Sequence, residues 1–204
     1  MILYRNTRLS KTTYTLTNKG KKMYRLGIDL GGTNIVAGIV DENCKIISTA
    51  KRKTNCPRPS EKIADDIAEA SFEAIEKAGI TLGDISVAGI GAPGDIDVKN
   101  GIILLADNLE FVNVPIVKML QERMGISFNI QNDANAAAYG EYIAGAGKGT
   151  KDFIMLTLGT GVGGGVVING NLYAGFSNKG AELGHSVINI DGEYVDEPCV
   201  VDGN

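Results

Sequence analysis

The sequence feature that most constrains the fold is a glycine-rich stretch at residues 153–173. It reads F-I-M-L-T-L-G-T-G-V-G-G-G-V-V-I-N-G-N-L-Y, with five glycines in the seven residues 159–165. Apolar and β-branched residues on both sides favour strands, and Asn169-Gly170 is typical of a tight hairpin turn. Glycines between strands let backbone N–H groups approach a ligand, and clustered N–H groups favour an anion. The stretch predicts a strand–turn–strand that holds phosphate, although a glycine hairpin without a ligand is an alternative for this stretch alone.

The same pattern occurs earlier in the chain. When Asp29 is aligned with Thr157, residues 26–41 and 154–169 match without a gap. Both segments contain a strand, a glycine turn, a second strand and a polar turn. A repeat is more informative than a single motif. Two copies of one phosphate-type hairpin predict two similar lobes that face each other, with a nucleotide in the cleft.

The remaining elements are predicted from apolar runs and from helical spacing of apolar residues. The strands are expected at 26–30, 35–40, 45–50, 85–90, 127–130 and 186–190. The helices are expected at 60–77, from Asn113-Val114-Pro115 onward, and at 134–144, with a loop at 91–95. A chain of 204 residues can form one large domain or two small ones.

Charge is distributed unevenly along the chain. Residues 1–22 contain six basic and no acidic residues, so the remainder has 14 basic and 24 acidic residues and a net charge of -10. An acidic body argues against nonspecific nucleic-acid binding. The basic extension at 1–22 lacks the apolar core of a secretory signal. We expect a disordered tail, or translated upstream sequence before a start at Met23, rather than a transit peptide.

The three cysteines and the hydropathy pattern predict a cytoplasmic protein. Cys44, Cys56 and Cys199 form no C-x-x-C pair and are odd in number, which favours reduced thiols. No apolar run reaches transmembrane length, so no membrane partner is expected.

Three glycine-rich matches are rejected as dinucleotide or P-loop fingerprints. G-x-G-x-x-G occurs at 159–164 and at 89–94, but the dinucleotide fingerprint requires a helix after the glycines, and neither match has one. Residues 147–150, G-K-G-T, lack the spacing of a P-loop and predict a surface loop.

Four motifs together resemble the ROK family, which contains bacterial glucokinases, related sugar kinases and sugar-responsive repressors. They are G-I-D-L-G-G-T-N at 27–34, N-D-A-N-A-A at 132–137, L-G-T-G-V-G-G-G at 158–165 and A-E-L-G-H at 181–185. The resemblance covers residues 23–192. It implies an α/β fold of the actin-like, ribonuclease H-like type with two lobes, and transfer of the γ-phosphoryl group of ATP to a sugar hydroxyl with Mg²⁺.

Phosphoryl transfer needs positioned phosphates, charge neutralisation by a metal and a group oriented on the attacking hydroxyl. Under this resemblance, Asp29 positions Mg²⁺ or its waters. The expected phosphate donors lie in the two glycine turns: Gly31, Gly32, Thr33 and Asn34 in the first, and Gly159, Thr160, Gly161 and Gly163 in the second.

Asp133 is the candidate catalytic base. It begins a predicted helix, where the helix dipole favours an ionised carboxylate. A carboxylate there can accept the proton of a sugar hydroxyl as that hydroxyl attacks. A plain helix cap is the alternative role. The other three motifs favour catalysis.

The sugar is expected to meet side chains from several segments. Asn108, Asn132, Glu182 and His185 match family positions that bind the sugar, and the Gly94 loop is expected to line the same pocket. Each also has a structural alternative, such as a turn, a cap or a surface acid. His185, the single histidine, would alone more often be structural than a ligand.

The end of the sequence departs from the family pattern. Many members bind a structural zinc through this histidine and the cysteines of C-x-C-G-x-x-G-C. Structural zinc usually takes four ligands, and His185 and Cys199 are two, so no zinc is expected. Members also continue with the rest of the second lobe. We therefore expect a truncated chain, with an N-terminal lobe at 23–130 and a partial second lobe at 131–204 that has an uncovered apolar face.

The leading hypothesis is an ATP-dependent kinase of glucose or a similar hexose. A non-catalytic remnant that binds sugar is the alternative that truncation supports. A sugar-responsive regulator is a weaker alternative, because residues 1–22 are too short for a helix-turn-helix domain. Family enzymes are often dimers or tetramers, so a homo-oligomer is a further expectation.

Overall fold

The computed structural model describes residues 23–159, 161–176 and 179–185. The predictions for the extension at 1–22, the strand at 186–190 and Cys199 lie outside the described residues, as does Thr160. None of the described helices has the length and apolar composition needed to cross a membrane.

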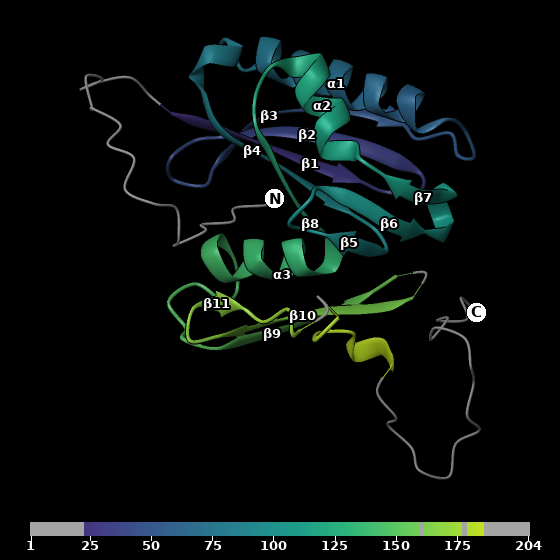
Figure 1. The fold of residues 1–204 in the computed structure, drawn as a ribbon. Helices are drawn as coiled ribbons and strands as arrows, with labels where there is room; N and C mark the ends of the chain where they lie inside the picture. Colours follow the sequence, from purple (N-terminus) through teal and green to yellow (C-terminus); the bar gives the residue numbers. More distant parts are fainter. Residues whose placement is uncertain (1–22, 160, 177–178, 186–204) are drawn as a thin grey trace.

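Helices and strands are arranged in layers. In chain order they are β1 (Tyr24–Leu30), β2 (Asn34–Val40), β3 (Ile46–Lys53), α1 (Ser60–Lys77), η1 (Leu82–Asp84), β4 (Ile85–Ala92), β5 (Asp95–Asp97), β6 (Ile102–Ala106), η2 (Asp107–Leu109), β7 (Phe111–Val114), α2 (Ile116–Met124), β8 (Phe128–Asn132), α3 (Asp133–Ala144), β9 (Phe153–Leu158), β10 (Val162–Ile168), β11 (Asn171–Leu172) and η3 (Leu183–His185). Figure 1 shows α1 and α2 above a five-stranded sheet, α3 below it, and the sheet of β9, β10 and β11 below α3.

The five-stranded sheet has the order β3-β2-β1-β4-β8. β1, β2 and β3 form an antiparallel meander, whereas β4 pairs parallel to β1 and β8 pairs parallel to β4. Parallel neighbours need a crossover connection, and α1 and α2 lie in these connections. The five strands match the sequence prediction within a few residues, and α1 matches it at both ends.

One face of this sheet is covered by helices. Alternation along β1 buries Leu26, Ile28 and Leu30, while Asp29 is exposed on the opposite side. α1 contributes a buried apolar stripe that includes Ile63. Burial of each such side chain stabilises the fold by about 1.5–3 kcal/mol. The helix-covered face is therefore the core, and the opposite face is free to build a site.

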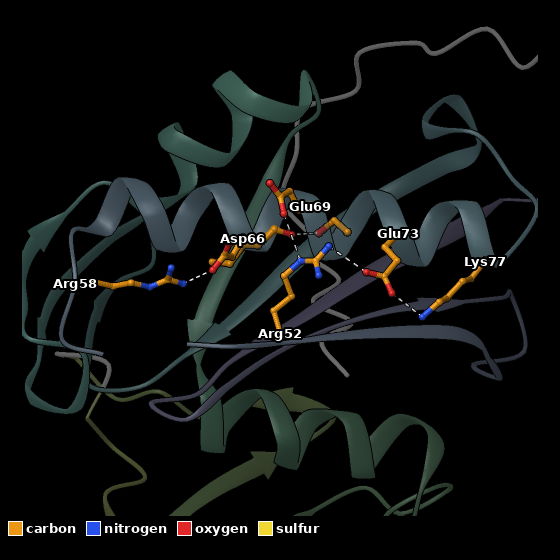
Figure 2. A network of polar contacts seen from close by, with 8 residues as sticks. Arg52, Arg58, Asp66, Glu69, Glu73 and Lys77 are labelled. Carbon is orange, nitrogen blue, oxygen red and sulfur yellow. Dashed lines mark hydrogen bonds and ion pairs between the residues drawn. The ribbon is translucent and has the colours of Figure 1, made fainter. Parts of the chain in front are cut away.

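Ion pairs hold α1 over the sheet and the preceding loop (Figure 2). Arg52 of β3 lies 3.1 Å from Glu73, which also accepts a hydrogen bond from Lys77 at 2.7 Å. Arg58, in the loop before α1, pairs with Asp66 nearer the start of the same helix. Partly exposed pairs contribute about 0–1 kcal/mol each. They orient α1 on the sheet, while apolar burial supplies most of the stability.

A small antiparallel sheet of β5, β6 and β7 was not anticipated. The sequence prediction has a loop at 91–95 and a helix opened by Asn113-Val114-Pro115. That helix start is wrong, because Val114 ends β7 and pairs with Ile103, and α2 begins at Ile116. Proline still marks the helix entrance, since its missing N–H costs nothing there. The two short apolar runs form strands because they pair with each other. The sequence pattern of either run alone does not predict this pairing.

The predicted hairpin at 153–173 is confirmed, with β11 added at its far edge. Its glycines also have a packing function. β10 lies between α3 on one side and η3 on the other, so that side chains at Gly164 and Gly165 would overlap Leu183 and Ala138, respectively. Part of the glycine cluster is therefore explained by the close packing of α3 and η3 against β10.

The two repeated hairpins differ in register by one residue. In the sequence alignment β2 and β10 coincide at both ends. However, Leu30 pairs with Ile35 in the first hairpin, whereas Leu158 pairs with Val162 in the second. The second turn is therefore one residue tighter, and equivalent residues of the two turns do not present their N–H groups identically.

Candidate functional site

The polar site residues gather where parallel strands end. Asp29 pairs with Gly91 near the end of β1 and β4, and Ala92 pairs with Asn132 at the end of β4 and β8. Ligands of open α/β sheets bind outside the carboxyl ends of the strands. The next residue after β8, Asp133, therefore starts α3 at the edge where such a ligand would lie.

A cavity of about 730 Å³ lies between the exposed face of the first sheet and the second hairpin. Small-molecule sites typically have volumes of about 300–1,000 Å³. Its lining includes six of the predicted site residues: Asp29, Asn108, Asp133, Gly161, Gly163 and Glu182. Five of the predicted phosphate-binding residues are not in the lining: Gly31, Gly32, Thr33, Asn34 and Gly159.

The first glycine turn lies beside the cavity and is held by buried contacts. The Gly31 N–H donates to the Asn34 carbonyl at 2.9 Å, which closes the turn. Thr54 is fully buried, and its hydroxyl donates to the Gly31 carbonyl at 2.6 Å. A side chain on Gly32 would lie 3.2 Å from the Asn108 amide nitrogen. The turn is therefore connected to the cavity through Asn108.

The cap of α3 is Asn132, not Asp133. The Asn132 side-chain oxygen accepts the Asn135 N–H at 3.1 Å, and Asp133 is the first helical residue. Asp133 Oδ1 accepts the Ala134 N–H at 2.8 Å. Because the cap position is filled by Asn132, a capping role does not account for an aspartate at 133.

Burial raises the pKa of the Asp133 carboxyl group above its ordinary value of 3.8. The nearby carboxylates of Asp29 and Glu182 raise it further, while the Ala134 N–H opposes the shift. Burial also raises the pKa of Asp29. Both residues are exposed where they line the cavity, and the protein around each carboxyl group displaces part of its hydration water. The site thus presents three acidic side chains to one cavity.

A second cavity of about 40 Å³ adjoins the first through Glu182, which lines both. Gly94, Asn132 and Glu182, all predicted sugar residues, are in its lining. Gly94 has a φ of 81°, and a Cβ there would lie 2.0 Å from the Leu105 carbonyl oxygen. Only glycine fits this position. His185 ends η3 nearby in sequence, and its side chain is not among those the structure describes.

Sequence reasoning missed several residues of the two cavities. Thr157 lines the larger one and is the repeat partner of Asp29, so the alignment already contained a signal for it. Asp95 and Lys179 line the smaller one and form an ion pair at 2.7 Å. Nothing in the local sequence links two residues so far apart.

The described residues contain no group of three or more His, Cys, Asp or Glu side chains placed to hold a metal ion. Mg²⁺ usually binds through one or two carboxylates together with substrate phosphates and water. Asp29, whose carboxyl group faces the larger cavity, fits that mode. The donor set therefore suits a metal that arrives with a nucleotide.

Comparison with known proteins identifies the family. The family model described as "ROK family" matches residues 25–200. The chain belongs to the ROK family. A glucokinase of Streptomyces coelicolor is 41% identical over 167 residues, covering 82% of this chain and 50% of that protein.

Two solved ROK structures share the fold. A ROK family glucokinase from Streptomyces griseus, in complex with glucose and AMPPNP, has a TM-score of 0.73 and 43% identity, covering 83% of this chain and 52% of that one. A ROK hexokinase from Thermus thermophilus has a TM-score of 0.76 and 34% identity, covering 87% and 58%. The α/β, actin-like fold implied by the resemblance is confirmed. The chain spans about half the length of the relatives it matches.

Proposed function

We propose that this ROK protein is part of an enzyme that transfers the γ-phosphoryl group of ATP to a hydroxyl of glucose or a similar hexose. The position of Asp133 carries the proposal: its carboxylate faces the larger cavity at the start of α3, while the cap role belongs to Asn132. The relatives named glucokinase, one of them solved with glucose and the ATP analogue AMPPNP, support the same activity.

In this proposal Asp133 is the general base. Its carboxylate accepts the proton of the attacking sugar hydroxyl and orients that oxygen. Partial burial, together with the nearby carboxylates of Asp29 and Glu182, raises its pKa, which brings its basicity closer to that required near neutral pH. An acidic group with a raised pKa in a cavity is a reasonable catalytic candidate on physical grounds.

The phosphates would be held by the two glycine turns. Gly161 and Gly163 present backbone to the larger cavity, and Thr160 lies between Gly159 and Gly161 in the sequence. On the opposite side Gly31, Gly32, Thr33 and Asn34 form the first turn. Asp29 would hold Mg²⁺ or its waters, and the metal would neutralise phosphate charge.

The sugar would occupy the region where the two cavities meet. Asn132 and Glu182 offer polar groups there, the Gly94 backbone forms part of the wall, and Asn108 approaches from the larger cavity. His185 completes the predicted set. Hydrogen bonds to several hydroxyls distinguish sugars by geometry.

The test is an assay of sugar-dependent ADP release over a panel of hexoses, with the wild type and Asp133→Asn. We expect the substitution to leave sugar affinity, measured by calorimetry, within about twofold of the wild type and to lower turnover by about 10²–10⁴-fold. Near-normal turnover in Asp133→Asn contradicts the role of this residue.

A non-catalytic sugar-binding protein is the second candidate. The observation that favours it is the exposed apolar face on β9. Binding of glucose without ADP release in the wild type would support it. The family also contains repressors, and nothing in the described residues favours that function over the kinase.

The cytoplasm is the proposed location, since Cys44 and Cys56 are both free thiols. A small sugar and Mg²⁺–ATP are the proposed partners, and a homo-oligomer without nucleic acid or membrane is the proposed state.

A further inference from the structure

An ion pair connects the two parts of the chain that flank the small cavity. Lys179, in the segment after β11, places its ammonium group 2.7 Å from Oδ2 of Asp95, the first residue of β5. Both side chains line the small cavity. The pair therefore bridges the wall formed by the first lobe and the wall formed by the second.

Lys179 is coupled directly to Glu182. The Glu182 N–H donates to the Lys179 carbonyl at 3.3 Å, so the two residues lie in one turn. The hydrogen bond to Asp95 raises the pKa of Lys179, and the Glu182 carboxylate raises it further. The ammonium group thus lies within electrostatic reach of both acids, and it offsets part of the negative charge around the cavity.

We propose that Lys179 and Asp95 are positioning residues that hold Glu182 against the small cavity and so set the affinity for a neutral hexose. This inference rests on the proposed sugar site. Without the pair, the turn at 179–182 loses its anchor on β5, and Glu182 samples more positions. Sugar binding then has to order that turn, which costs affinity but leaves the base, Asp133, in place.

The size of the effect follows from the exposure of the pair. The side chains of Lys179 and Asp95 are 55% and 37% exposed. An exposed ion pair stabilises a protein only slightly, so removing one changes an equilibrium constant by about two- to fivefold. We therefore expect Lys179→Met and Asp95→Asn each to raise the KM for glucose about two- to fivefold with kcat unchanged.

The first experiment needs no activity. Amide hydrogen exchange of the sugar-free protein is measured for peptides that cover residues 179–185. Lys179→Met and Asp95→Asn should both accelerate exchange there, and Lys179→Arg, which keeps the cation, should restore the wild-type rate. Lys118→Met removes an exposed pair with Glu122 on α2 and should leave these peptides unchanged. Unchanged exchange in both neutralised variants overturns the proposal.

The second experiment separates positioning from simple stability. The KM for glucose is measured at increasing salt concentration, which screens exposed charges. The wild-type KM should rise toward that of Lys179→Met, whose own KM should stay constant. A drop in kcat instead of a rise in KM contradicts the positioning role. If the wild type phosphorylates no sugar, the proposed kinase function fails, while the exchange experiment still decides whether the pair anchors Glu182.

Discussion

Gly165 of β10 lies directly against Ala138 of α3: a Cβ added to the glycine would stand 2.3 Å from the Cβ of Ala138. Real Cβ atoms do not approach so closely. The small residue on each side lets the helix and the strand come into backbone contact. This contact places the beginning of α3, and with it Asp133, beside the second glycine turn.

Gly165→Ala is therefore expected to lower the free energy of unfolding by about 1–3 kcal/mol, because overpacking forces α3 away from β10. Urea denaturation measures the change. Gly38→Ala is the matched control, since a Cβ there meets Thr49 at an ordinary 3.7 Å. That control should be neutral or stabilising by up to about 1 kcal/mol. Equal stability of the two variants would show that the close contact is not present in solution.

Asn132 gives a prediction about helix capping. Asn132→Ala removes the acceptor of the Asn135 N–H and should lower the free energy of unfolding by about 0.5–2 kcal/mol. Asn132→Ser keeps a cap and should retain most of the stability. Both variants lose the side-chain amide, so both should bind glucose more weakly if this amide contacts the sugar. Equal loss of stability in both variants contradicts the cap assignment.

Much of the first lobe and of the site is predictable from sequence because the signals are local. The apolar run at 26–30 identifies β1, and the gapless repeat identifies the second hairpin. Six predicted site residues line one cavity, and among them Asp29 lies near the end of β1 and Asp133 directly follows β8.

The parts that escaped prediction depend on contacts between distant segments. Glycine at 164 and 165 looks like a ligand loop, yet Leu183 and Ala138 fill the space where side chains would be. The Lys179–Asp95 pair joins residues that no spacing rule relates. Sequence patterns indicate which residues favour a helix or a strand. Contacts such as these depend on how helices and strands pack against one another in three dimensions.

The raised pKa of Asp133 predicts a stability that depends on pH. A carboxyl group with a higher pKa in the folded state binds its proton more tightly there, so its contribution to stability is lost as pH rises through the folded pKa. Ionisation of Asp133 in the folded state therefore costs stability at neutral pH, and Asp133→Asn removes this cost. The variant should therefore have a higher Tm than the wild type at pH 7, and the difference should disappear as pH falls toward 3.8, the ordinary value. Thermal denaturation without ligands measures this.

Asp97 provides a control, because its substitution should change Tm in the opposite direction. The Asn100 side chain donates to its carboxylate at 2.7 Å, and this hydrogen bond lowers the pKa of Asp97. Such a group stabilises the fold above its unfolded pKa, and the contribution is lost as pH falls through the folded pKa. Asp97→Asn should therefore lower Tm at pH 7 and have a smaller effect in acid. If Asp133→Asn lowers Tm at pH 7, as Asp97→Asn should, the assignment of Asp133 as a carboxyl group with a raised pKa is wrong.

The outer face of β9 predicts self-association. Ile154, Leu156 and Leu158 alternate along the strand and are 65%, 58% and 76% exposed, and β9 is an edge strand among the described residues. Apolar side chains beside an unpaired strand edge favour association between chains. Ile154→Lys/Leu156→Lys should decrease the sedimentation coefficient at high concentration and reduce binding of a hydrophobic dye. Tm should change little, because these side chains make few intramolecular contacts. Phe72→Lys, on the exposed side of α1, should alter neither measurement. If the double variant sediments like the wild type, this face is not what brings chains together.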